Sequence, residues 1–329
     1  MSNYKRSVFL VWKVYQRRAE SLAYYFDMPI IYCHYAWEER SKVHKMLSYL
    51  FKSAVTMFYL MRNRPTVIFI QLPPTPALYI TAVYGILTGT PYIADCHNAM
   101  FMGWWARWPL VKTFMRRAAV VLVHNHEVCR EAEKIGVRAI VLRDPLPQPK
   151  QIKDSDLLQR LGLVQNNYVI APWNLASDEP MAEFIDAVRR TPDVKFVMTW
   201  FTERLPDELR TDLPDNLIFT GYLEIDEFNE LFSKSGAAIS LTIRPGTQPS
   251  AASEAIAFGV PLILSDMETA RSLYREVPVF VDNDPPSISA GVQEIMANQD
   301  HYRKKVLGFR EELRREIERE IEQLKARLA

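Results

Sequence analysis

The residues best suited to chemistry lie between 237 and 266. An apolar run of strand character ends there in a polar loop, residues 244–248, which Pro249 and an apolar helical pattern follow. Proline is favoured at the first position of a helix, where its missing N–H costs nothing. The helix start then presents free backbone N–H groups and the positive end of its dipole. This arrangement predicts an anion site suited to a diphosphate.

Glu254 lies about one turn inside this predicted helix. Its carboxylate is placed to accept hydrogen bonds from the two hydroxyls of a ribose while the loop binds phosphates. A first-turn glutamate that only complements the helix dipole is an equally good interpretation, and the residues leave both open.

Histidines follow two apolar runs in the first half. His97 comes after Asp95 at the end of one run, and position alone leaves contact with a ligand and a role as a core histidine both open. His124 and His126 have the spacing of two ligands on one strand face, but no third ligand follows, so no metal site is predicted. The sequence also lacks the GxSxG, GxGxxG and GxxxxGK[ST] patterns, which disfavours serine hydrolases, nicotinamide or flavin enzymes and P-loop NTPases.

Short apolar runs alternate with longer amphipathic stretches along most of the chain. The runs are continuous rather than alternating, as is typical of parallel strands covered on both faces. Regular alternation of such strands with helices predicts doubly wound α/β sheets. The expected strands are 8–12, 29–34, 66–72, 92–97, 119–124 and 139–143, then 168–173, 194–199, 217–221, 237–242, 261–265 and 279–281.

A proline-containing polar stretch, residues 144–166, interrupts this alternation and predicts a linker. We therefore expect two Rossmann-like domains, 1–147 and 148–300, facing an interdomain cleft, and a C-terminal amphipathic helix, 301–329. Apolar residues at helical spacing in this last segment suit a single helix packed on the body. They also allow a short coiled-coil seam, and with it a homodimer.

Composition is that of a globular protein: 329 residues, 48% apolar and 24% charged. The net charge of +1 hides an asymmetry, because residues 1–150 carry 20 basic and 9 acidic side chains. The basic half is expected to face an anionic partner. Three cysteines without CxxC spacing indicate reduced thiols and a cytoplasmic protein.

Two features bear on membranes. The uncharged stretch 65–94 is long enough to span a bilayer, but its prolines and a Thr-Gly-Thr-Pro turn favour a strand, a loop, a helix and a second strand. Residues 101–117 combine three tryptophans with four basic residues, and the expected helix 41–64 is also basic. Both suit an anionic membrane surface, the alternative being core helices with basic side chains that reach solvent. No nucleic-acid-binding motif is present, and no nucleic-acid partner is predicted.

The run 253–266, SEAIAFGVPLILSD, resembles the EAxAxGxPxIxSD signature of GT-B-fold glycosyltransferases of the retaining family-4 type. Weaker similarities lie at 216–222 (NLIFTGY), 225–239, 93–98 (IADCHN) and 121–136. The QRRAE opening, a DEP loop and a TxQxxAxEA segment are closer to a divergent branch of that family.

This resemblance implies transfer of a sugar from a nucleoside-diphosphate sugar, without a metal, to a saccharide or lipid-linked acceptor in polysaccharide or glycolipid assembly. It also implies retention of configuration. Together with the basic and aromatic segments, it leads us to expect a cytoplasmic protein that can bind the inner face of the membrane as a peripheral protein. Gly246 departs from the family pattern by replacing the first glutamate of Glu-x7-Glu, and the usual diphosphate-binding Arg and Lys are missing from loop 173–180. A non-catalytic GT-B subunit and a nucleotide-sugar epimerase are the alternatives. The expected catalytic residues are His97 and Arg244, and the expected donor-binding residues are Arg17, Arg18, Trp173, Asn174, Ser177, Tyr222, Thr247, Gln248, Ser250 and Glu254.

Overall fold

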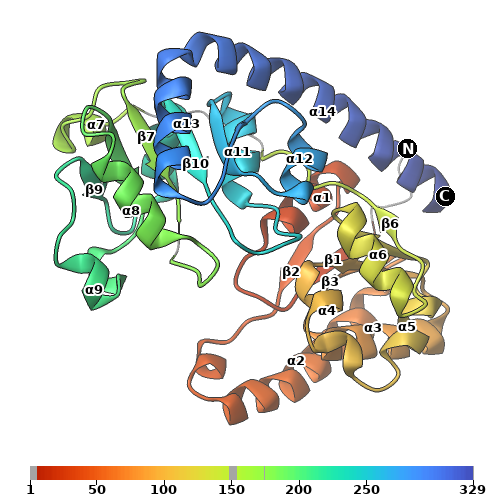
Figure 1. The fold of residues 1–329 in the computed structure, drawn as a ribbon. Coiled ribbons are helices and arrows are strands. Elements are labelled where there is room, and N and C mark those ends of the chain that lie inside the picture. Colours follow the sequence, from red (N-terminus) through yellow and green to blue (C-terminus); the bar gives the residue numbers. More distant parts are fainter. Residues whose placement is uncertain (1–5, 148–153, 174, 329) are drawn as a thin grey trace. The chain divides into compact units, whose positions relative to one another are not determined.

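The computed structural model describes residues 6–147, 154–173 and 175–328. The chain divides into two compact units, Met1–Pro145 with Glu316–Ala329, and Leu146–Arg315. Each unit holds one six-stranded parallel sheet, and Figure 1 labels its elements. The sequence places the boundary after residue 147 and sets 301–329 apart. The structure instead divides the last helix between the two units.

The first unit has the strand order β2-β1-β3-β4-β5-β6. The chain leaves β1 toward β2 on one side and returns to β3 on the other, so the topology switches between β1 and β3, where ligands bind in doubly wound sheets. Its elements are β1 (Val8–Val11), α1 (Arg17–Phe26), β2 (Ile30–Tyr32), η1 (Ala36–Glu39), α2 (Lys42–Asn63), β3 (Ile68–Leu72), α3 (Thr75–Thr88), β4 (Tyr92–Cys96), α4 (Asn98–Met102), η2 (Trp105–Arg107), α5 (Val111–Arg117), β5 (Val120–Val123), α6 (His126–Lys134) and β6 (Ile140–Val141).

The second unit has the order β12-β11-β10-β7-β8-β9, with its switch between β7 and β10. Its elements are α7 (Leu157–Arg160), β7 (Tyr168–Ala171), α8 (Met181–Arg189), β8 (Lys195–Met198), η3 (Thr202–Arg204), α9 (Asp207–Arg210), β9 (Leu217–Phe219), α10 (Ile225–Ser233), β10 (Ala237–Ser240), α11 (Ser250–Phe258), β11 (Leu262–Ser265), α12 (Glu268–Tyr274), β12 (Val279–Val281), α13 (Pro285–Ala297) and α14 (Gln299–Leu328).

Continuous apolar runs form the central strands of both sheets. Every residue of β1, β3, β4, β5, β7, β10 and β11 is buried, which requires cover on both sheet faces. Two doubly wound α/β units are therefore confirmed. The stretch 65–94 forms β3, α3 and β4, and among the described residues no helix is long and apolar enough to cross a membrane.

Two expected helices differ in detail. The pattern predicts one helix over 105–118, but Pro109 and the left-handed backbone of Leu110, at φ 60°, separate η2 from α5. A proline in a helix interior lacks the N–H that the helix needs, which explains the break. Helix α11 starts at Ser250, with Pro249 as its N-cap rather than its first residue.

Helix α14 buries four of the five apolar positions that the sequence places at helical spacing; the fifth, Leu328, lies outside the residues whose side chains are described. Leu313 contributes to the second unit, and Ile317, Ile321 and Leu324 to the first, all at most 6% exposed. Arg143 fixes the last turns by ion pairs to Glu316 and Glu320, at 2.6 and 2.7 Å. This is the packing of a single amphipathic helix on its own chain.

Candidate functional site

Polar side chains gather at the carboxyl ends of the strands in both units. In the second unit they surround the loop between β10 and α11, beside the topological switch. In the first unit they follow β1, β4, β5 and β6. Each group is described within its own unit.

Hydroxyl, amide and carboxylate groups hold the β10–α11 loop in place by hydrogen bonds. Thr242 Oγ1 donates to Asp178 Oδ2 at 2.7 Å and accepts from the backbone N–H of Arg244 at 3.1 Å. Ser265 Oγ accepts from the Thr242 N–H and donates to Asn283 Oδ1, and Asn283 Nδ2 closes the ring at the Thr242 carbonyl. This network joins the ends of β10, β11 and β12 to the β7–α8 loop, so the loop backbone is preorganised.

The loop then turns into α11 at Gly246. Gly246 is buried and has φ +72°, a left-handed conformation that glycine adopts far more easily than glutamate. A glutamate at this position would adopt this backbone only at a cost. The Gln248 Oε1 atom is buried without a hydrogen-bond partner among the described residues, which leaves an acceptor at the start of α11.

The expected ligand-binding residues of this loop differ in exposure. Arg244 and Ser250 are exposed and Thr247 is half-buried, so all three remain accessible. Glu254 is 6% exposed, in the second turn of α11 and one turn from its N-terminus. A buried carboxylate at this place is more than a solvated first-turn charge.

Three further expected contacts lie in the β7–α8 loop, Trp173, Asn174 and Ser177, and a fourth, Tyr222, lies in the β9–α10 loop. Trp173 is 2% exposed, donates Nε1–H to the Ile239 carbonyl and packs on Phe184, so its indole belongs to the core that supports the loop. Ser177 is exposed, and Tyr222 is 73% exposed. Asn174 lies outside the described residues.

In the first unit, Arg18 joins three segments. Its Nε donates to Asp95 Oδ1 at 2.8 Å, and its Nη1 donates to Asp144 Oδ1. Burial alone would lower the pKa of Arg18, but the two carboxylates raise it, so Arg18 is always charged. Burial raises the pKa of Asp95, whereas Arg18 outweighs burial at Asp144 and lowers its pKa. The charge of Arg18 is therefore already compensated by protein groups.

His97 caps α4 beside this ion-pair cluster. Gln16 Nε2 lies 2.6 Å from His97 Nε2, and the His124 ring centre lies 6.0 Å away. Burial lowers the pKa of His97 to about 3, and it also lowers that of His124. Both imidazoles are neutral at pH 7, so His97 offers hydrogen bonds rather than positive charge.

The structure thus unites Gln16, Arg18, His97, His124 and Asp144 in the first unit. In the second it unites Asp178, Thr242, Arg244, Ser265 and Asn283. Arg17 is half-buried at the start of α1, next to Arg18. Sequence reasoning missed Gln16, Asp144, Asp178, Ser265 and Asn283 as parts of the site, although each follows or ends an apolar strand run. Among the described residues, no three His, Cys, Asp or Glu side chains are placed to hold a metal ion.

Residues 201–312 match the family model of glycosyl transferases group 1. The match covers about a third of the chain, and the solved structures below show that the whole chain has the GT-B fold. Anabaena HepE, solved with UDP-glucose, aligns with this GT-B chain at 13% identity and a TM-score of 0.71, covering 97% of this chain and 99% of HepE.

Two other solved structures share the GT-B fold. A trehalose-6-phosphate synthase, studied for glycosyl transfer with retention, gives 12% identity, a TM-score of 0.66 and coverage of 98% and 99% of the two chains. A putative UDP-N-acetylglucosamine 2-epimerase of Listeria monocytogenes gives 11% identity and a TM-score of 0.61, and the alignment covers 92% of this chain and 91% of the epimerase. No curated protein matches the sequence.

Proposed function

We propose that this GT-B protein transfers a sugar from a nucleoside-diphosphate sugar to an acceptor hydroxyl. The observation that carries the proposal is the preorganised β10–α11 loop, which leads into α11 with Glu254 buried one turn inside. It lies at the topological switch of its sheet and inside the region that matches group 1 glycosyltransferases. HepE, solved with UDP-glucose, has the same fold.

In this proposal the second unit binds the donor. The N-terminal N–H groups of α11, with Ser250 and Thr247, bind the diphosphate, and exposed Arg244 supplies a positive charge. Glu254 accepts hydrogen bonds from the ribose hydroxyls, and Gln248 Oε1 is available to a donor group of the sugar nucleotide. Arg244 with the helix dipole offsets the charge of the leaving diphosphate, so no metal is required.

The first unit contributes the neutral His97. In the reaction the bond between the anomeric carbon and the diphosphate oxygen breaks, and the acceptor oxygen bonds to that carbon. The acceptor hydroxyl gives its proton to the released diphosphate or to water. We assign His97 to orienting the sugar, because a neutral imidazole can hydrogen-bond to hydroxyls without trapping the anion. The trehalose-6-phosphate synthase fold supports retention of configuration.

The acceptor is proposed to be a saccharide or a lipid-linked saccharide, in polysaccharide or glycolipid assembly at the inner face of the membrane. The basic first half of the chain supports an anionic or membrane-bound acceptor. A homodimer through α14 would have to use other side chains than Leu313, Ile317, Ile321 and Leu324, which are buried in their own chain.

Calorimetric titration with UDP, GDP, ADP and their sugars tests donor binding. For the nucleotide that binds, Glu254→Gln is expected to weaken affinity by about 1.5–3 kcal/mol, roughly tenfold to a hundredfold, because it removes hydrogen bonds to a charged group. Glu268→Gln is the control, since Glu268 is an exposed acidic residue at the start of α12. Unchanged affinity in Glu254→Gln would remove the ribose assignment.

Transfer is measured separately, by release of nucleoside diphosphate with candidate acceptors. His97→Ala is expected to slow release strongly while donor affinity stays within a few fold. If no sugar nucleotide binds at millimolar concentration, a non-catalytic GT-B subunit explains the chain better. Interconversion of the bound sugar without release of diphosphate would favour the epimerase, whose Listeria representative has this fold.

A further inference from the structure

Helix α2 buries a row of polar residues beside Tyr49 and Leu60 and leaves many of its apolar side chains exposed. Ser48, Lys52 and Thr56, spaced four residues apart, are at most 3% exposed and point into the first unit. Lys52 Nζ pairs with Glu38 at 2.6 Å, and Thr56 Oγ1 accepts from Trp12 Nε1 at 3.1 Å. A surface helix ordinarily buries its apolar stripe and exposes its polar one. Many of the apolar side chains of α2 therefore lie on its outer, exposed face.

That outer face is apolar along its length. Leu50 is 71% exposed and Phe58 is 69% exposed, and the neighbouring helix α3 exposes Leu87 to 70%. Soluble monomers rarely leave contiguous apolar areas of this kind uncovered. Further exposed apolar side chains on the same two helices are Val43, Met46, Leu47, Phe51, Met61, Val83 and Ile86.

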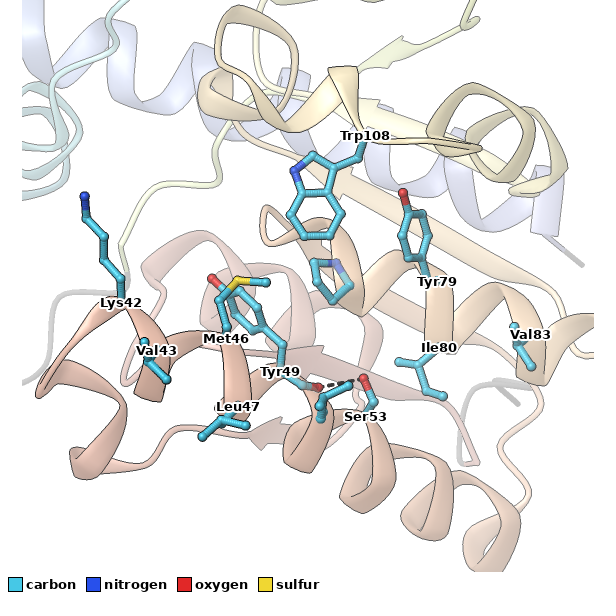
Figure 2. Close-up of a pocket in the computed structure, with 12 residues that line it drawn as sticks. Lys42, Val43, Met46, Leu47, Tyr49, Ser53, Tyr79, Ile80, Val83 and Trp108 are labelled. Atoms are coloured by element: carbon cyan, nitrogen blue, oxygen red, sulfur yellow. Dashed lines mark hydrogen bonds between the residues drawn. The ribbon is translucent and has the colours of Figure 1, made fainter.

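A groove of about 650 Å³ runs between α2 and α3. Figure 2 shows Met46 and Leu47 of α2 on one side, Tyr79 and Ile80 of α3 on the other, and Trp108 over the space between them. Its lining is almost entirely apolar, and its volume lies within the ~300–1,000 Å³ of pockets that hold small ligands. Lys42 is the charged residue of the lining.

Most charges around the groove are basic; the acidic residues next to α2 are Glu38, which pairs with Lys52, and Glu39, both in η1. The sequence from Arg40 to Ala94 contains no Asp or Glu, and neither does the sequence from Cys96 to His126. Lys42 and Lys45 lie at one end of α2 and Arg62 and Arg64 at the other. An apolar face with basic ends is complementary to an anionic lipid surface, where each Lys or Arg favours binding.

Aromatic side chains lie beside the groove. The rings of Trp104, Trp105 and Trp108 stack with centroids 4.2 to 5.8 Å apart, and Trp104 is 53% exposed. Tyr79 donates its hydroxyl to the Pro109 carbonyl, which fixes the 104–110 segment over α3. Tryptophan and tyrosine are enriched where hydrocarbon meets headgroups.

We propose that α2, α3 and residues 104–110 form a membrane-docking face, and that the groove between α2 and α3 takes up one acyl chain of an anionic phospholipid. The exposed apolar side chains enter the headgroup boundary, and Lys42 and Lys45 pair with lipid phosphates. The site is separate from the β10–α11 loop. The proposal goes beyond glycosyl transfer, and its test uses no sugar nucleotide, so either proposal can fail alone.

The test is flotation of the full chain with vesicles of phosphatidylcholine, with and without phosphatidylglycerol. Binding is expected with phosphatidylglycerol and is expected to weaken as salt rises. Leu47→Gln with Leu50→Gln is expected to reduce partitioning at least about tenfold, because two exposed apolar anchors are lost. Lys42→Gln with Lys45→Gln is expected to reduce it about tenfold or more and to weaken its salt dependence.

Val164→Gln with Ile225→Gln is the matched control, since both residues are exposed apolar side chains of the second unit, 67% and 55% exposed. This pair should bind vesicles like the wild type, and thermal unfolding verifies that all variants fold. A phosphatidylglycerol with a photoreactive acyl chain is expected to label α2 and α3 peptides, and Ile80→Trp, which fills the groove, to reduce that labelling severalfold.

Negligible binding to both vesicles would overturn the proposal, as would equal binding by Leu47→Gln/Leu50→Gln and the wild type. Labelling confined to other peptides would overturn the acyl-chain site. A wild-type dimer in solution that Leu47→Gln/Leu50→Gln dissociates would show that a second copy covers this face.

Discussion

The two units present polar groups at the same edge of the same kind of sheet, but they build that edge from different chemistry. The first unit uses full charges, with Arg18 buried between Asp95 and Asp144. The second uses mainly hydroxyls, an amide and backbone groups around Thr242, with Asp178 as the one carboxylate in the network. Its cation, Arg244, is exposed.

This difference indicates which of the two polar edges is suited to binding an anion. A guanidinium already paired with two carboxylates has little positive potential left for a diphosphate, so Arg18 is better suited to fixing α1 against β4 and the segment after β6. The second half of the chain is acidic overall, yet its loop offers helix N–H groups and an exposed arginine. The net charge of a unit therefore does not locate its anion site.

Removing the buried cation Arg18 from the polar edge of the first unit should have the largest effect on stability. Arg18→Met leaves Asp95 buried, at 0% exposure, without its counter-charge, and should lower the free energy of unfolding by about 3–5 kcal/mol. Chemical denaturation measures the loss. Arg138→Met, an exposed arginine of the same unit, should change stability by about 0.5 kcal/mol or less.

A second variant separates structure from binding. Arg18→Met with Asp95→Leu removes both charges and should recover part of the lost stability. If Arg18→Met kept full stability and lost affinity for nucleotide, Arg18 would be the donor-binding residue that the sequence predicts, and the contrast between the two edges would not hold.

The pH dependence of stability tests the first unit's polar edge further, through the buried His97. The pKa of His97 is lowered by burial to about 3, against about 6.5 in an unfolded chain. Below pH 6.5 the unfolded chain gains a proton that the folded protein does not bind, so stability falls as pH falls. At pH 5 this histidine should account for about 2 kcal/mol of lost stability relative to pH 8.

His97→Gln should remove that part of the pH dependence, measured as unfolding free energies from pH 8 to pH 5. The pKa of His124 is lowered in the same direction, so a reduced slope should remain. His126→Gln, at an exposed position, serves as the control. Identical slopes for His97→Gln and the wild type would show that His97 takes up its proton in both states.

The fold follows from local signals, because continuous apolar runs separated by helical patterns specify parallel strands covered on both faces. The polar contacts at the strand ends of the first unit do not follow from local signals. Arg18 reaches Asp95 and Asp144 across 77 and 126 positions, and no local pattern encodes such pairs. Helix α2 shows a further limit, since the structure buries Ser48, Lys52 and Thr56 beside Tyr49 and Leu60, and the sequence pattern does not single out this polar row.

For Glu254 and Trp173, the sequence predicts the place in the fold but not the orientation of the side chain. Glu254 was predicted from its place behind a helix start, and its burial agrees with a fixed position. The resemblance implies that Trp173 contacts the donor. In the structure its indole is buried against Phe184 and donates to the Ile239 carbonyl. Sequence position places a residue at an edge but does not orient its side chain.

The smallest expected effect tests the hydroxyl network of the second edge. Thr242→Val keeps the shape of the side chain but removes the hydroxyl that donates to Asp178 and accepts from the Arg244 N–H. Stability should fall by about 1 kcal/mol, the net value of such hydrogen bonds. Thr220→Val is the control, because the Thr220 hydroxyl bonds only to the carbonyl of the next residue, Gly221. Ser265→Ala, tested alone and together with Thr242→Val, should show a coupling of at least about 0.5 kcal/mol, since both hydroxyls hold the same loop. Strict additivity would mean that the two hydroxyls act independently, and that the second edge is not held as one network.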